Sequence, residues 1–169
     1  LLQLAGGAVY DENGKAQIVH DQKLEVLDQL IEEANGQPVL VFYNYKHELD
    51  RLQARYPQAI HVKEENVVKR WNAKEIPILL ANPASAGHGL NLQFGGHIAI
   101  WYSPTWNLEF FQQANKRLHR RGQAETVLIH TLMAKGTIDE RIYDIVLRNK
   151  EAGQNALLEA VKARIKEVT

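Results

Sequence analysis

The sequence has no cysteine among its 169 residues and no net charge. Without cysteine, disulfide cross-links and thiolate metal sites are excluded, and the composition fits a reducing compartment. The longest apolar runs, "PVLVF" and "IPILLA", are far shorter than the roughly 20 residues that a membrane-spanning helix needs. Because 20 Lys and Arg balance 20 Asp and Glu, any contact with nucleic acid must come from a local basic patch.

Signatures of several kinds of catalytic site are also absent. There is no G-x-S-x-G nucleophile motif, no phosphate-binding G-x-x-x-x-G-K-[ST] loop and no D-E-x-H. The seven histidines have neither H-x₃-H nor H-E-x-x-H spacing, so no metal site is expected. The glycines at 87 and 89 do not begin a dinucleotide fingerprint, because Leu92 stands where the third glycine is required.

Short apolar strands alternate with amphipathic helices along most of the chain. Strands are expected at 38–44, 59–62, 76–82, 97–102 and 126–133, and helices at 21–34, up to Pro57, at 65–74 and at 107–121. Strands that are apolar throughout indicate a mainly parallel α/β sheet covered by helices on both faces. Ligands are then expected beyond the carboxyl ends of the strands, in the loops after Phe42, Leu80, Trp101 and Leu132.

We expect one domain over residues 1–169, since this length supports a single core. Residues 1–20 are turn-rich and are expected to be irregular. Helices are expected over 137–169, where Leu158, Val161, Ile165 and Val168 recur at helical spacing. The sequence opens on Leu1 rather than methionine, and we therefore expect it to be a piece of a longer chain.

The segment "QANKRLHRRGQ", residues 113–123, concentrates positive charge in a neutral chain. If residues 108–121 are helical, Gln113, Arg117 and Arg120 share one face. An adjoining apolar stripe would dock on the sheet through Phe111, Ala114 and Leu118. Arginine suits rigid, bidentate contact with phosphate, although a charge run of this kind is also typical of a solvated helix face.

A glycine-rich segment, "ASAGHGLNL" at 84–92, directly follows the strand "ILLAN". Gly87 and Gly89 allow backbone N–H groups to approach an anion closely, and Ser85 can bond a phosphate or cap a turn. The alternative is an ordinary turn between a strand and a helix.

The order of these segments resembles the SWI/SNF-like, superfamily-two helicase-related ATPases. "QANKRLHRRGQ" is similar to motif VI, Q-x-x-x-R-x-H-R-x-G-Q, and "LLANPASAGHGLNL" is similar to motif V, which ends A-G-x-G-x-N-L. "VLVFYNYKHELDRL" resembles motif IV, "DQKLEVLDQLI" the preceding helix, and "MAKGTIDERIYDIVLRNK" the segment after motif VI. Pro83-Ala84-Ser85 and Lys116 depart from the usual motifs and favour a phage or prophage type.

The resemblance implies a RecA-like fold and a role as the second, C-terminal lobe, because the phosphate loop and the Mg²⁺-holding acid belong to the first lobe. ATP with Mg²⁺ would lie between the lobes, with Arg117 and Arg120 as arginine fingers and Gln113 as a nucleotide sensor. Further ATP contacts are implied at Gly87, Gly89 and Asn91. Motif V would contact nucleic acid through Ser85, Ala86, Gly87 and His88.

We therefore expect the C-terminal lobe of an ATP-dependent nucleic-acid translocase or helicase, inactive as an ATPase by itself. Its expected partners are an N-terminal RecA-like lobe of the same protein and nucleic acid, in the form of double-stranded DNA. A monomer in the cytoplasm of a bacterial or phage-infected cell, associated with the nucleoid and not with membrane, is expected. The alternatives are a stand-alone nucleic-acid-binding module, a complete α/β kinase or transferase, and a lobe that has lost catalysis.

Overall fold

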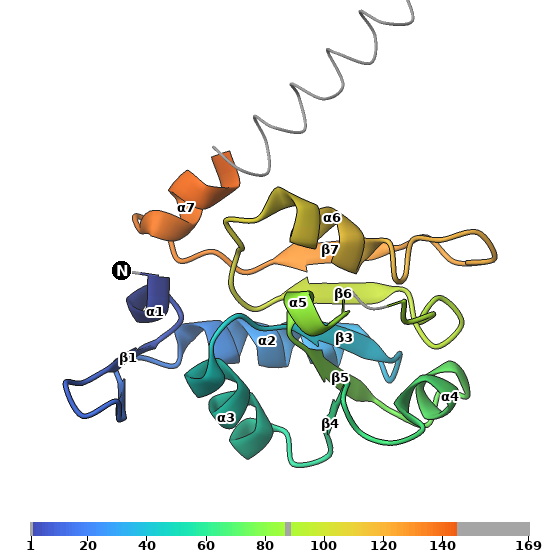
Figure 1. Cartoon of the computed structure of the whole chain (residues 1–169), viewed down its shortest axis with the longest axis horizontal. Helices are drawn as coiled ribbons and strands as arrows, with labels where there is room; N and C mark the ends of the chain where they lie inside the picture. The colour runs from blue at the N-terminus through green and yellow to red at the C-terminus, as the bar shows by residue number, and fades with distance from the viewer. Residues whose placement is uncertain (1, 87–88, 145–169) are drawn as a thin grey trace, which may run out of the picture.

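A five-stranded parallel sheet forms the centre of the protein. The computed structural model describes residues 2–86 and 89–144, and the sheet has the order β4-β5-β3-β6-β7 (Figure 1). Its strands are β3 (Val39–Phe42), β4 (Ile60–His61), β5 (Ile78–Ala81), β6 (Ile98–Trp101) and β7 (Leu128–Thr131). All five coincide with expected strands, so the predicted parallel α/β architecture is confirmed.

Burial along the strands follows their place in the sheet. Every residue of β3, β5 and β6 is buried, as expected for strands with neighbours on both sides and helices on both faces. At the edge the expectation of burial is wrong, because Leu128 and Ile129 of β7 are 46% and 42% exposed. Only β6 pairs with β7 in this sheet, so its outer side has no neighbouring strand to cover it.

Helices cover the two faces of the sheet with separate apolar clusters. On one face, α2 (Gln22–Glu33) and α3 (Lys46–Arg55) pack through Leu24, Leu27 and Leu52. On the other face, α4 (Val67–Asn72) and α6 (Leu108–Asn115) pack with Trp71 and Ala114 against alternate residues of the same strands. The remaining described helices are α1 (Leu2–Ala5), α5 (Pro83–Ala86) and α7 (Ile138–Ile142).

The opening segment is more regular than the expectation for residues 1–20. After α1, strands β1 (Ala8–Tyr10) and β2 (Ala16–Ile18) pair as an antiparallel hairpin. Arg51 of α3 fixes the base of this hairpin by donating to the carbonyls of Gly6 and His20 at 2.7 and 2.6 Å. Three-residue strands are too short to give a clear alternating pattern, which explains why the sequence suggested only turns.

The ends of α2 were predicted with partial success. Asn35 and Gly36 terminate it with φ values of 49° and 80°, in the left-handed region typical of helix stops. Asp21 occupies the expected N-cap position but makes no side-chain capping bond. Its carboxylate instead accepts a hydrogen bond from Arg51 at 2.7 Å.

The helix expected over 107–121 is shorter in the structure, and this changes the geometry of the basic segment. α6 ends at Asn115, and residues 116–121 form turns. The amides of Arg117 and Leu118 bond three residues back, to Ala114 and Asn115. Gln113, Arg117 and Arg120 therefore do not share one helix face, and that prediction is wrong. The apolar stripe is confirmed, because Ala114 and Leu118 are fully buried and Phe111 packs beside them.

Candidate nucleotide and nucleic-acid sites

The glycine-rich segment, residues 84–92, and the basic segment, residues 113–123, meet at the amino-terminal edge of the sheet. Gln123 donates through Nε2 to the carbonyl oxygens of Gln93 at 2.8 Å and Gly96 at 3.0 Å, just before β6 begins. This edge is the right side of Figure 1, opposite the carboxyl ends of the strands. The meeting point therefore lies away from the loops after the carboxyl strand ends, where ligands are expected.

Asn91 and Arg120 are also in direct contact at this meeting point. Arg120 Nη1 donates to Asn91 Oδ1, and both residues are exposed. Arg117 lies close by, half-buried, and its pKa is lowered first by burial and then by the charge of Arg120. Two guanidinium groups that repel one another are stabilised by a shared anion, which makes this pair suited to a phosphate.

Gln113 bonds to a residue of its own helix. It lies on α6, and its Nε2 donates to Glu109 Oε1 one turn earlier, at 2.9 Å. Gly89 has φ of 69°, so it uses the backbone freedom expected of a glycine there. Gly87 and His88, expected to contact ATP and nucleic acid respectively, lie outside the described residues.

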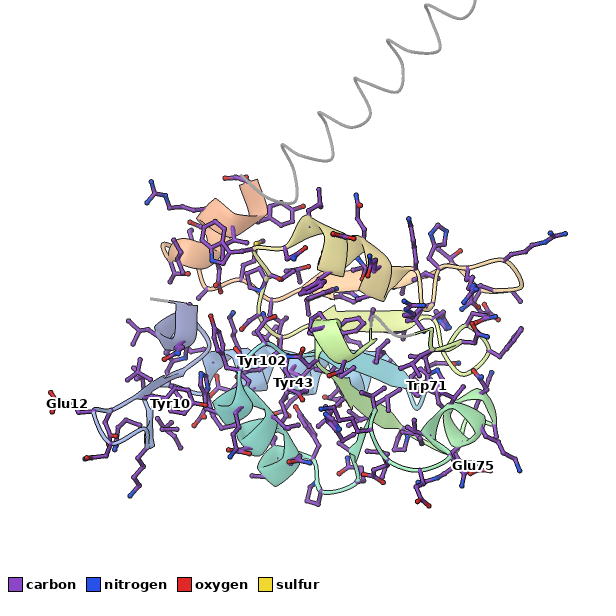
Figure 2. The ribbon with its side chains drawn as sticks, viewed as in Figure 1. Tyr10, Glu12, Tyr43, Trp71, Glu75 and Tyr102 are labelled. Atoms are coloured by element: carbon purple, nitrogen blue, oxygen red, sulfur yellow. The ribbon has the colours of Figure 1, made fainter. Side chains whose placement is uncertain are left out.

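Trp71 holds the Asn91 segment in place from α4. Its side chain is completely buried, and its Nε1 donates to the carbonyl of Leu92 at 2.8 Å. Asn72 donates to the carbonyl of Asn91 at 2.9 Å. Figure 2 shows Trp71 beside α4, at the opposite end of the sheet from Tyr43 and Tyr102. Trp71 and Gln123 were not predicted as site residues, although Gln123 belongs to the motif that raised the resemblance.

A separate hollow lies at the carboxyl-terminal edge, where the loops after β3, β5 and β6 converge. Its volume is about 280 Å³, and its lining combines amide and aromatic side chains. The lining residues are Asn44, Tyr45, Asn82, Pro83, Ala84, Pro104, Thr105, Trp106, Asn107 and Phe110. Trp106 and Phe110 are 46% and 38% exposed. The loops after Phe42, Leu80 and Trp101 thus meet as expected, and Ser85 and Ala86 continue directly from the lining of the hollow.

Side-chain amides fix the three loops around this hollow. Asn44 Nδ2 donates to the carbonyls of Ser103 and Pro104 at 3.0 and 3.1 Å. Asn82 Nδ2 donates to the carbonyls of Tyr43 and Asn44 at 3.3 and 3.4 Å. The sequence alone gave no sign of this, because the bonded residues lie about 40 to 60 positions apart.

Buried charged residues lie beneath the hollow. Lys23, Glu48 and Asp139 are at most 4% exposed. Burial raises the pKa of Glu48, although hydrogen bonds from Ser103, Asn44 and Tyr45 and the charge of Lys23 oppose this shift. The signal available in the sequence was the position of Lys23 on an otherwise apolar helix face and of Asp139 in "KGTIDE".

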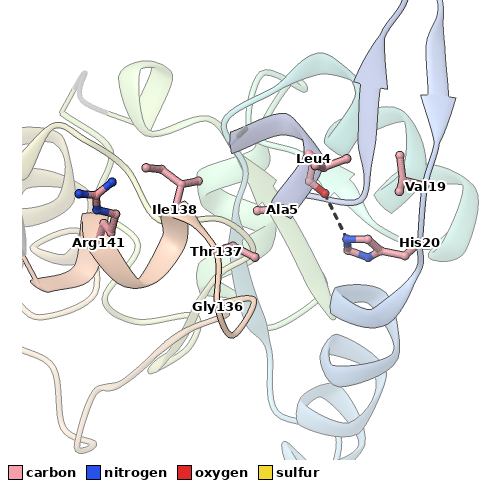
Figure 3. A pocket seen from close by; sticks show the side chains of 8 residues that line it. All are labelled: Leu4, Ala5, Val19, His20, Gly136, Thr137, Ile138 and Arg141. Carbon is pink, nitrogen blue, oxygen red and sulfur yellow. Dashed lines mark hydrogen bonds between the residues drawn. The ribbon is translucent and has the colours of Figure 1, made fainter.

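A second concave region lies between α1, the segment leading into α2, and α7. It has a volume of about 590 Å³, and Figure 3 shows Leu4, Val19 and Ile138 among its apolar lining, with His20 bonded to the Leu4 carbonyl at 3.1 Å. In the described part of the chain, no three His, Asp or Glu side chains are grouped to hold a metal ion. No helix among the described residues is long and apolar enough to span a bilayer.

Comparison with known proteins places these features in a family. Residues 22–122 match the helicase conserved C-terminal domain. The chain is 41% identical over 172 residues to putative protein p41 of Acyrthosiphon pisum secondary endosymbiont phage 1, covering 97% of this chain and 37% of that protein. It is 32% identical over 170 residues to the chromatin-remodeling ATPase INO80 of Mycosarcoma maydis, covering 89% of this chain and 9% of that protein.

Two further matches agree with this placement. The uncharacterized ATP-dependent helicase MG018 of Mycoplasma genitalium is 30% identical over 154 residues, covering 89% of this chain and 14% of that protein. The crystal structure of the C-terminal part of the Fun30 ATPase domain shares the fold with a TM-score of 0.66 and 24% identity, over 77% of this chain and 46% of that one. The chain spans well under half of the relatives that it matches. It belongs to the helicase conserved C-terminal domain family, as a RecA-like C-terminal lobe of the SWI/SNF-like kind.

Proposed function

We propose that this chain is the second lobe of an ATP-dependent nucleic-acid translocase, in which Arg117 and Arg120 reach the γ-phosphate of ATP held by an N-terminal lobe. The observation that carries the proposal is the contact between Arg120 and Asn91, with Arg117 beside it. Positive charge placed at a phosphoryl group in transfer raises the rate by ~10³–10⁵.

The residues of this lobe fit part of an ATP site. Segments 89–97 and 116–123 supply guanidinium and amide groups and contain no Asp or Glu. They can meet phosphate oxygens but offer no carboxylate for Mg²⁺, which takes oxygen ligands. The metal ligands and the phosphate-binding loop therefore belong to the N-terminal lobe, and this chain alone should not hydrolyse ATP. Gln113, whose amide bonds Glu109, would have to exchange that partner to sense the nucleotide.

The hollow at the carboxyl-terminal edge suits a nucleic-acid strand. Exposed Trp106 and Phe110 offer flat apolar surfaces against which the sugars of one strand can pack. Ser85 would extend the track through its hydroxyl, because its N–H already donates to the Asn82 carbonyl at 3.0 Å, and Ala86, Gly87 and His88 follow it in the sequence. We propose double-stranded DNA as the substrate.

The test uses the intact two-lobe protein with matched variants of the basic segment. Arg120→Ala and Arg117→Ala should each lower the DNA-stimulated rate of ATP hydrolysis by ~10³ or more. Arg121→Ala removes an equally exposed arginine from the same segment and should leave the rate unchanged. Equal effects of Arg120→Ala and Arg121→Ala would refute the arginine-finger role.

A second set of measurements addresses the nucleic acid. Trp106→Ala should weaken the binding of duplex DNA measurably, because it removes an exposed apolar surface from the hollow. Stimulation by duplex DNA, single-stranded DNA and duplex RNA should be compared, and preference for RNA would contradict the choice of DNA. Salt-dependent DNA binding by the isolated chain that disappears in an Arg117→Ala, Arg120→Ala double variant would favour the stand-alone binding module instead.

A further inference from the structure

A buried ion pair joins α7 to α2 beneath the carboxyl-terminal edge. Lys23 Nζ lies 2.6 Å from Asp139 Oδ2, and the two residues are 4% and 0% exposed. The amide of Ala134 also donates to Asp139 Oδ2, at 3.0 Å, while no partner lies within bonding distance of the buried Oδ1 among the described residues. The charge of Asp139 is therefore balanced chiefly by Lys23.

The same lysine is connected to the hollow through a serine. Lys23 Nζ donates to Ser103 Oγ at 3.4 Å, and Ser103 Oγ donates to Glu48 Oε1 at 2.5 Å. Glu48 Oε2 then accepts hydrogen bonds from the amides of Asn44 and Tyr45, at 2.8 and 3.2 Å. Asn44 and Tyr45 line the hollow, so a continuous polar path leads from α7 to its wall.

Apolar side chains could occupy the position of the buried ion pair between Lys23 and Asp139. A buried ion pair contributes little net stability, and apolar residues of similar volume often serve as well or better. Breaking such a pair, in contrast, leaves an uncompensated buried charge. What this cluster provides is a fixed relative position for the groups that it connects.

Apolar packing joins α7 to α6, because Ile142 and the partly buried Ile138 cluster with Leu108 and Phe111. Ile142 is fully buried against Leu108, at the start of α6. The side of α7 that carries Ile138 and Arg141 borders the cavity of about 590 Å³ (Figure 3). The ion pair between Asp139 and Lys23 connects α7 to α2.

We propose that Asp139 and Lys23 are positioning residues that transmit the location of α7, through Ser103 and Glu48, to the nucleic-acid-binding loops at Asn44 and Tyr45. This inference rests on the proposed role of the hollow in binding nucleic acid. If Asp139 loses its charge, Glu48 is the remaining buried acid near Lys23. The ammonium group is then drawn toward Glu48 and displaces the Ser103 hydroxyl that lies between them.

The experiment measures two properties of the intact protein carrying Asp139→Asn. The concentration of duplex DNA that half-saturates ATP hydrolysis should rise about tenfold, with the rate at saturation within about twofold of wild type, because binding rather than chemistry is affected. Amide hydrogen exchange at Asn44 and Tyr45, without DNA, should accelerate about tenfold as their bonds to Glu48 weaken.

Two further variants separate this path from general destabilisation. Asp21→Asn breaks another ion pair of 2.7 Å at the start of α2, with Arg51, and should change neither property. Ser103→Ala removes the connecting hydroxyl but keeps the ion pair, and it should reproduce both effects even if Asp139→Asn fails to fold. In a double-mutant cycle, Asp139→Asn and Ser103→Ala should be strongly non-additive.

The outcomes distinguish this inference from the proposed function. In one outcome, DNA stimulates the wild-type protein while Asp139→Asn and Ser103→Ala change neither the half-saturating DNA concentration nor the amide exchange. That result overturns the positioning role and leaves the proposed function intact. Accelerated exchange at Asn44 and Tyr45 in a protein that no nucleic acid stimulates supports the path through Ser103 and refutes the function of the hollow. A lower unfolding temperature as the sole effect of Asp139→Asn, with Ser103→Ala unchanged, also overturns the positioning role.

Discussion

A methyl group added at Gly95 should disrupt the packing that holds the Asn91 segment against α4. An ideal Cβ at this buried position would lie 2.3 Å from Trp71 Cδ1 and 2.3 Å from the Trp71 carbonyl oxygen. Gly95 does not have a positive φ, so the conflict in Gly95→Ala is steric and not a matter of backbone conformation. Since one of the contacts is with backbone, a change of side-chain rotamer cannot relieve it.

The expected cost follows from two contributions. Overpacking of a close-packed interior costs ~1–3 kcal/mol. Displacing Trp71 also breaks the 2.8 Å bond from its Nε1 to the Leu92 carbonyl, and the buried indole N–H left unpaired costs a further ~1–3 kcal/mol. Gly95→Ala should therefore reduce the free energy of unfolding by about 2–6 kcal/mol. In a chain of this size, the midpoint temperature of thermal unfolding falls by roughly 2–4 °C for each kcal/mol lost.

Thermal and denaturant unfolding of the 169-residue chain measure this effect, with Gly14→Ala as the matched control. Gly14 has φ of 75°, and nothing lies within 4 Å of its Cβ position, so the control carries backbone strain without a clash. It should cost only ~1–2 kcal/mol. A loss in Gly95→Ala no larger than in Gly14→Ala would show that Trp71 does not fix this segment.

Three further predictions concern other parts of the lobe. Asn107→Ala should cost ~1 kcal/mol in denaturant unfolding, because Asn107 Oδ1 accepts a bond from the Phe110 amide at 3.0 Å; an unchanged stability would contradict the cap. Tyr56→Phe should cost ~1.5–3 kcal/mol by the same measurement, since its hydroxyl donates to the Asp28 carboxylate at 2.6 Å, and a neutral result would show that this bond is not made in solution. Burial lowers the pKa of His47 from its usual 6.5, so the unfolded chain binds this proton more readily than the folded one. The free energy of unfolding should then fall as the pH drops below 6.5. An equal slope of unfolding free energy against pH in His47→Phe would refute the assignment of this effect to His47.

The layered fold was predictable because its signal is local. Each inner strand is a short run of apolar residues between turn signals, and such runs form buried parallel strands wherever helices cover both faces. The edge strand β7 has the same composition but exposes Leu128 and Ile129. Position in the sheet depends on the order of all five strands, which no single run of residues encodes.

The limits of helical periodicity are clearest in the basic segment. The pattern of Phe111, Ala114 and Leu118 continues past Asn115, but the backbone leaves the α-helix there. Asn115 is buried, and its Oδ1 accepts a bond from Trp101 Nε1 at 2.9 Å. Gly122, with φ of 97°, turns the chain toward β7 soon afterwards. These are tertiary constraints, so the pairing of Arg120 with Asn91, 29 residues away, does not follow from the helix pattern.

The same reasoning explains why the hollow was only partly predicted. The loops after Phe42, Leu80 and Trp101 were expected to meet, since parallel strands end at one edge. The exposure of Trp106, which is 46%, does not follow from that rule. Whether Trp106 is buried or exposed depends on how its loop is oriented against the other loops. That orientation is fixed by long-range hydrogen bonds such as those from Asn44 to the carbonyls of Ser103 and Pro104.

Helix α6 lies between the two proposed sites and connects them. Phe110 on its first turn and Asn107 just before it line the hollow, while Arg117 lies two residues beyond its end. Its 8 residues span only ~12 Å at 1.5 Å per residue. The fully buried Ala114 and the bond from Trp101 to Asn115 fix it on the sheet. Because so short a helix moves as a rigid body, displacing Phe110 along the axis displaces the turn that carries Arg117 and Arg120 by a similar distance. In the proposed function, a strand bound in the hollow and a phosphate bound by the arginines would therefore act on the same element, from opposite edges of the sheet.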